Sequence, residues 1–127
     1  MSRVVHFEIH ADQPERAIRF YSSLFGWTFQ KWDGPMPYWM VMTGDGPGID
    51  GGLMPRQGPP PADGAACNCY TCVLDTNDLD GLLARIPPAG GVCVVPKMAV
   101  PGVGYLAYFK DTEGNIFGAM QSDPAAK

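Results

Sequence analysis

The sequence predicts an α+β fold that contains two copies of one βαβββ unit. The main observation is an internal repeat. Residues 1–60 and residues 67–122 show the same order of patterns: an alternating strand, an amphipathic helix, a glycine turn and short extended runs. An offset of about 65 residues places His6 on Thr71. Short turns rich in Gly, Pro and Asp separate the extended runs, which favours antiparallel hairpins inside each copy.

The first copy spans residues 1–55. Its first strand, residues 4–10, alternates apolar and polar side chains with the period of two that is typical of a strand. We expect a helix next, with Asp12 as its N-cap, Pro14 in its first turn and Gly26 at its end. Further strands are predicted at residues 28–32, 38–43 and 51–55.

A connector at residues 56–66 joins the copies. It contains three successive prolines and no hydrophobic periodicity, which favours an extended and semi-rigid segment. The second copy spans residues 67–122, with a helix at 78–86 whose leucines recur at helical spacing. Its strands are predicted at residues 67–75, 92–96, 104–110 and 116–121. We expect one domain over the full 127 residues.

The composition argues against several classes of partner. The formal charge is −4 and no cluster of Lys or Arg is present, so binding to a nucleic-acid backbone is not expected. No apolar run approaches the roughly 20 residues that cross a bilayer, so no membrane partner is expected either. We predict a cytoplasmic protein whose four cysteines stay reduced.

Polar residues whose side chains could take part in binding or catalysis share one face of the first strand. His6, Glu8 and His10 alternate with Val5, Phe7 and Ile9. If Glu8 is buried, its pKa rises and it suits general-base chemistry; if it lies at a cavity rim, it is only a solvated carboxylate. His6 likewise is either functional or a structural histidine that hydrogen bonds inside a partly polar cavity.

Three motifs resemble a known family. They are VVHFEI at residues 4–9, ERAIRFY with LFGW at residues 15–27, and FKDTEGN at residues 109–115. Together with the repeat they resemble the vicinal oxygen chelate superfamily, which includes glyoxalase, bleomycin-resistance proteins and extradiol dioxygenases. Small bacterial glyoxalase-like proteins are similar in particular. The resemblance implies that both βαβββ modules form a cupped mixed sheet with the helices outside.

The resemblance also implies a metal site in those members that are metalloenzymes, with one ligand on the first and fourth strands of each module. His6 matches the first ligand. The second position falls within the Gly51–Met54 segment, which has no carboxylate or imidazole. The third falls on Thr71, or on Cys69 if the strand slips by two residues, and the fourth falls on Gly118. Because a catalytic divalent ion needs about three protein ligands, no metal cofactor is expected.

The leading interpretation is a protein of the glyoxalase and bleomycin-resistance type that binds a small apolar or aromatic ligand in a cupped cavity. The candidate ligand-binding residues are His6, Glu8, Trp39, Met54, Thr71, Tyr108 and Met120. The alternative is a lyase or dioxygenase-type enzyme. It would use either a nonstandard divalent metal at His6, or metal-free chemistry with Glu8 as base and His6 as polarising donor. By analogy with the family we also expect a homodimer.

Overall fold

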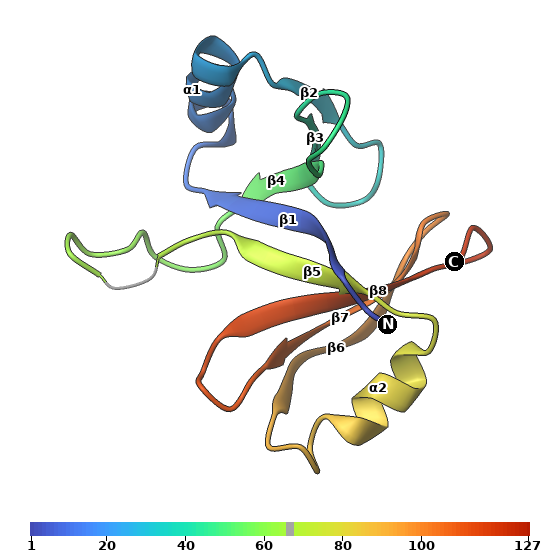
Figure 1. The fold of residues 1–127 in the computed structure, drawn as a ribbon. Helices are drawn as coiled ribbons and strands as arrows, with labels where there is room; N and C mark the ends of the chain where they lie inside the picture. Colours follow the sequence, from blue (N-terminus) through green and yellow to red (C-terminus); the bar gives the residue numbers. More distant parts are fainter. Residues whose placement is uncertain (66–67) are drawn as a thin grey trace. The chain divides into compact units, whose positions relative to one another are not determined.

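The structure is a computed structural model that describes residues 1–65 and 68–127 (Figure 1). Over these residues it contains eight strands and two helices, in the order β1-α1-β2-β3-β4 and then β5-α2-β6-β7-β8. This order confirms the α+β class and the repeated βαβββ unit. The chain divides into two compact units, His6–Tyr70 and a unit made of Met1–Val5 with Thr71–Lys127. We name them module one and module two.

The module boundaries differ from the predicted ones. Residues 1–5 group with module two because Arg3 and Asp75 are joined twice: the Arg3 N–H donates to Oδ1 of Asp75 (2.7 Å), and the Asp75 N–H donates to the Arg3 carbonyl oxygen (3.1 Å). Tyr70 belongs to module one, where its ring stacks on Phe7 with centroids 5.7 Å apart. Cys67, the first residue of the predicted second copy, lies outside the described residues.

Module one forms a four-stranded mixed sheet. Its elements are β1 (Val4–Ala11), α1 (Pro14–Phe25), β2 (Thr28–Lys31), β3 (Trp39–Met42) and β4 (Gly51–Pro55). The strands lie in the order β2-β3-β4-β1, in which β2, β3 and β4 pair antiparallel and β4 pairs parallel with β1. The predicted strands therefore exist, with β2 and β3 slightly shorter than expected.

Helix α1 begins and ends where proline and glycine require it. Pro14 stands in the first turn, where its missing N–H costs nothing, and Gly26 adopts φ 72° and donates its N–H to Ser22. The expectation that Asp12 caps the helix was wrong. Gln13 is the N-cap residue, without a side-chain bond, because the Asp12 carboxylate instead pairs with Arg56 at 2.8 Å.

The core of module one lies between α1 and one face of the sheet. Ile9, Ala11, Val41 and Leu53 are its buried members, and α1 contributes Ala17, Ile18 and Tyr21. The other face of the sheet carries the side chains that alternate with these, including His6 and Glu8. The period of two along β1 thus separates the packing residues from the polar ones.

Module two repeats the same topology. Its elements are β5 (Thr71–Asp75), α2 (Leu79–Arg85), β6 (Val92–Val100), β7 (Gly104–Lys110) and β8 (Ile116–Ser122). The strands lie in the order β5-β8-β7-β6, with β5 and β8 parallel. Figure 1 shows α2 beside these strands. Its core contains Leu79, Ile86, Ala107, Phe109 and Ala119. Neither helix in the described part of the chain is long and apolar enough to cross a membrane.

Two strands of module two differ in length from the prediction. Strand β5 begins at Thr71, so the expected start at residue 67 was too early. Strand β6 continues past Pro96 to Val100, whereas the sequence predicted an end at residue 96. Pro96 is tolerated because β6 is the last strand in the order and the register with β7 shifts between Val95 and Met98. A proline at an edge or a bulge removes no bond from the ladder.

Replacing Leu79 by Ala is expected to destabilise the protein by about 2–5 kcal/mol, because the fully buried leucine would leave a cavity in the core of module two. The free energy of unfolding from urea titration tests this. Leu24→Ala is the matched control, since Leu24 is 59% exposed on α1 and its loss should cost no more than about 0.5 kcal/mol. Equal losses in the two variants would contradict the described core.

Candidate functional site

One face of β1 carries the polar side chains of the candidate site. Side chains alternate along a strand, so His6 and Glu8 point away from the core that Phe7 and Ile9 join. The Glu8 residue is buried, with 3% of its surface exposed. In the parallel register it lies opposite Gly52 of β4. The two strands therefore place a buried carboxyl group beside a position that has no side chain.

The phenol of Tyr38 occupies the space above Gly52. A Cβ atom added to Gly52 would overlap the Tyr38 hydroxyl. The same hydroxyl oxygen lies 2.8 Å from Nε2 of His6, and a hydrogen bond joins the two side chains. Trp32 holds Tyr38 just before β3: its N–H donates to the Tyr38 carbonyl oxygen (2.8 Å), and the two rings meet edge to face at 6.3 Å. Only glycine at position 52 allows this arrangement.

Burial controls the protonation of this pair. It raises the pKa of the Tyr38 phenol well above the usual 10, and the negative charge of Glu8 adds to the rise. Burial also lowers the pKa of His6 below the usual 6.5, while the carboxylate of Asp50 opposes that change. At neutral pH the phenol is therefore protonated and the imidazole is neutral. A protonated phenol can donate a hydrogen bond to a neutral imidazole or to a bound oxygen atom.

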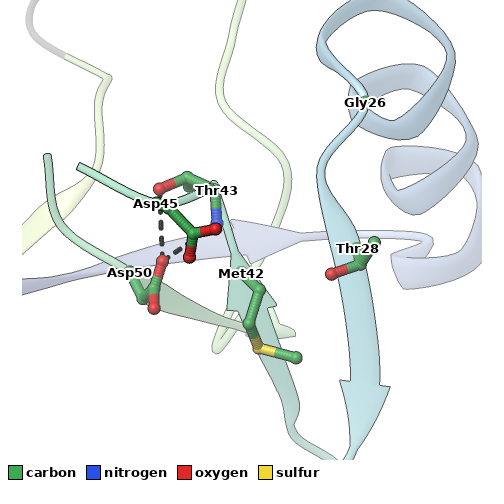
Figure 2. A pocket seen from close by; sticks show the side chains of 7 residues that line it. Gly26, Thr28, Met42, Thr43, Asp45 and Asp50 are labelled. Carbon is green, nitrogen blue, oxygen red and sulfur yellow. Dashed lines mark hydrogen bonds between the residues drawn. The ribbon is translucent and has the colours of Figure 1, made fainter. Parts of the chain in front are cut away.

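A pocket of about 310 Å³ lies where β2 begins and β3 ends in module one (Figure 2). Its lining residues are Gly26, Thr28, Met42, Thr43, Gly44, Asp45 and Asp50. Met42 shares the face of Gly52 because it lies two residues from Met40, the cross-strand partner of Gly52. Figure 2 shows Asp50 beside Thr43, whose N–H donates to Oδ1 of Asp50 at 2.9 Å. The Asp50 carboxylate thus lines this pocket and also opposes the lowering of the His6 pKa.

The other predicted residues of module one fall on opposite faces. Met54 pairs with His10 in the register of β1 and β4, so it shares the face of His6. Trp39 does not: it pairs with Leu53 and packs against the core beneath α1. Its inclusion among the residues of the His6 face was wrong. Alternation along β3 puts Met40 on that face in its place, where Met40 is 42% exposed.

The predicted ligand-binding residues of module two are Thr71, Tyr108 and Met120, and they lie on the face of its sheet away from α2. Tyr108 of β7 pairs with Gly118 of β8, and Asp75 of β5 pairs with Met120. These positions alternate with Ala107, Phe109 and Ala119 of the core, so Tyr108 and Met120 lie on the other face. Thr71 shares that face of β5 by the same alternation. A tyrosine therefore covers a glycine in both modules, because a Cβ atom on Gly118 would contact the Tyr108 ring at 3.1 Å.

The metal positions that the family resemblance implies in module one are His6 and the Gly51–Met54 segment. Of these positions only His6 offers a ligand atom, and its Nε2 already bonds to the Tyr38 hydroxyl. Gly52 has no side chain, and the phenol that covers it keeps its proton because its pKa is raised. Across residues 1–65 and 68–127, no group of three or more His, Cys, Asp or Glu side chains is arranged to hold a metal ion.

Sequence reasoning did not single out Tyr38 or Asp50 as members of the site. The sequence predicted a strand from residue 38, but Tyr38 lies just before β3, and its partner His6 is 32 residues away along the chain. One signal could have found it. A glycine at a position where the family carries a ligand leaves space, and a large polar side chain from a neighbouring strand can occupy that space. Asp50 was recognisable only as the carboxylate nearest to β4.

Comparisons with known proteins agree on the family. The family model described as Glyoxalase/Bleomycin resistance protein/Dioxygenase superfamily matches residues 3–118. A glyoxylase-like domain-containing protein of Didymella fabae is 32% identical over 113 residues, which cover 85% of this chain and 84% of that protein. The anthracycline biosynthesis protein DauV of Streptomyces sp. (strain C5) is 28% identical over 120 residues, which cover 87% of this chain. The match spans only 44% of the length of DauV, and the same share of the first curated relatives.

Solved structures show the same fold at low sequence identity. Methylmalonyl-CoA epimerase from Mycobacterium tuberculosis is similar with a TM-score of 0.68 and 14% identity, over 95% of this chain and 88% of that chain. This likeness concerns the fold alone. The family model covers most of the chain, and the Didymella fabae relative matches 85% of it. The chain therefore belongs to the glyoxalase/bleomycin resistance protein/dioxygenase superfamily.

Proposed function

We propose that this chain binds a small organic molecule on the face of module one that carries His6, Glu8 and Tyr38, without the four-ligand metal site of the family's metalloenzymes. The observation that carries the proposal is the Tyr38 hydroxyl, which lies over Gly52 and 2.8 Å from Nε2 of His6. This hydroxyl bonds to the ring nitrogen that would hold an ion, and it fills the space that the second ligand of the ion would need. This face then offers protein hydrogen-bonding groups in place of an ion.

The side chains around the pair indicate the class of ligand. Three methionines, Met40, Met42 and Met54, share the face and supply adaptable apolar contacts. Tyr38 and His6 supply a polar centre that suits a carbonyl or hydroxyl oxygen. Sites for small ligands usually combine an apolar lining with a few polar groups. The proposed ligand is therefore an apolar or aromatic compound with at least one such oxygen.

Several further expectations belong to this proposal. Thr71, Tyr108 and Met120 of module two remain proposed ligand contacts, and their common face away from α2 is compatible with that role. The homodimer and the cytoplasmic location remain predictions from the sequence. The activity and partners of the longer relatives are not assigned to this chain, because it spans 44% of their length.

The second candidate is an enzyme, and the burial of Glu8 favours it. The carboxylate of a buried residue that lies near a protonated phenol is a reasonable general base, with Tyr38 or His6 as the donor that stabilises a developing oxyanion. A nonstandard divalent metal at His6 is the other form of this candidate. The two classes differ in turnover. A binding protein has no turnover, whereas an enzyme should lose turnover in the Glu8→Gln variant while that variant still binds the ligand.

Tyr38→Phe is expected to weaken ligand binding about 2- to 12-fold, because it removes one hydrogen bond of about 0.5–1.5 kcal/mol. A thermal-shift screen of aromatic and dicarbonyl metabolites would supply the ligand, and calorimetric titration would give the dissociation constants. Tyr105→Phe is the matched control, since Tyr105 packs against the core of module two. The proposed site would be refuted if both variants weakened binding equally, or if Tyr38→Phe left the dissociation constant of the ligand unchanged.

Protein purified without a metal-affinity tag is expected to retain far less than one equivalent of divalent metal after incubation with Ni²⁺, Zn²⁺, Mn²⁺ or Fe²⁺ and dialysis. The reason is that the His6 nitrogen and the space above Gly52 are already occupied by Tyr38. Elemental analysis by mass spectrometry checks this. Near-stoichiometric metal that disappears in His6→Ala would contradict the proposal and favour the metalloenzyme.

The imidazole of His6 is expected to titrate below pH 6.5 in an NMR titration, because burial lowers its pKa. Since the folded-state pKa lies below the unfolded value, the corresponding stability is fully present above about pH 6.5 and is lost as the pH falls through the folded-state pKa. Asp50→Asn should lower the pKa further, since it removes the charge that favours the imidazolium. Asp45→Asn is the control that should leave it unchanged. A His6 pKa above 6.5 would refute the described burial.

A further inference from the structure

A second pocket of module one lies where β1 ends and α1 begins, and it shares no residue with the pocket in Figure 2. Its volume is about 360 Å³, near the lower end of the range for small-ligand sites. Residues from three parts of module one line it: the end of β1, four residues of α1, and Arg56, which directly follows β4. Nothing in the proposed function uses this pocket.

Arg56 is held in a fixed orientation at this pocket. Its Nε donates to Oδ1 of Asp12 at 2.8 Å, and its Nη2 donates to the carbonyl oxygen of His10 at 3.2 Å. The two acceptors lie at the end of β1 and directly after it, so two different nitrogens of the guanidinium are held. A guanidinium has five N–H donors, and two bonds do not exhaust them. An arginine with a fixed plane is well suited to bind a carboxylate.

The charges at the pocket favour an anion with one negative charge. The Asp12 carboxylate balances the charge of Arg56. Arg16, in the first turns of α1, adds a second guanidinium to the lining, and it forms no ion pair with residues 1–65 or 68–127. His10 contributes little charge at neutral pH, because burial and the nearby Arg56 lower its pKa. The lining therefore carries a local excess of about one positive charge in a chain whose formal charge is −4. A monoanion matches this balance better than a doubly charged phosphate.

The rest of the lining is apolar. Ile9 and Ala11 are buried beside the pocket, at 5% and 7% exposure. The ring of Phe20 lines it as well but is 55% exposed, which is unusual for an aromatic side chain on the apolar row of a helix. A ligand with an aromatic or branched aliphatic body would cover Phe20 and remove apolar area from water.

We propose that this pocket is a second ligand site that binds a small monocarboxylate with an aromatic or branched aliphatic body. The carboxylate bonds to Arg56 and Arg16, and the apolar body packs against Phe20 and Ala17. The site is independent of the His6–Tyr38 face, so either proposal can fail without the other.

The test uses 3-phenylpropanoate as the probe and the full chain as the protein, with binding followed by backbone amide shifts in NMR. We expect saturable shifts at residues 9–21 and 56, and binding about fivefold or more weaker for the neutral 3-phenylpropanamide. Arg16→Gln should weaken binding of the acid by a similar factor. Its matched control is Arg19→Gln, because Arg19 is exposed on the same helix but does not line the pocket.

A second pair of variants tests the apolar wall. Phe20→Ala should weaken 3-phenylpropanoate binding, whereas Phe25→Ala should not, since Phe25 is equally exposed at 59% but lies outside the pocket. Equal effects of the Arg16 and Arg19 variants, equal affinity for the acid and the amide, or shifts centred on His6 and Glu8 would each overturn the proposal. Absence of saturable binding at millimolar probe would overturn it too.

Discussion

The alternation of side chains along β1 is the constraint on which module one depends. Phe7 and Ile9 join the core beneath α1, while His6 and Glu8 project from the other face of the same strand. A shift of the register by one residue would exchange the two sets, burying imidazole and carboxylate in the core. The parallel pairing with β4 fixes that register and also sets Gly52 opposite Glu8. Core and candidate site are therefore specified by the same strand pairing.

Keeping Glu8 out of water opposes folding, since a buried carboxyl group loses its hydration and must be compensated by neighbours. Such a cost is typical of functional positions, where a low local dielectric also strengthens the hydrogen bonds of a bound molecule. The two copies of the βαβββ unit differ here. The offset that places His6 on Thr71 places Glu8 on Val73, which is buried and apolar. The two copies thus share a topology, but the position of the buried carboxyl group in module one is apolar in module two.

Local pattern predicted most of the fold. The repeat, the order of the strands, the end of α1 at Gly26 and the buried face of α2 all follow from spacing over a few residues. What the sequence did not predict depends on partners far along the chain. Asp12 was expected to cap a helix, but it meets Arg56, which lies 44 residues away. Trp39 and Met40 are adjacent and both suit a ligand site. Only the register of β3 against β4 decides which of them shares the face of His6.

The close approach of Tyr38 to Gly52 couples the two positions. A Cβ atom at position 52 would overlap the phenol, so the Tyr38 side chain would have to shift to admit any substitution there. Residues in direct contact do not contribute additively to stability. The effect of a substitution at position 52 should therefore depend on which residue stands at position 38.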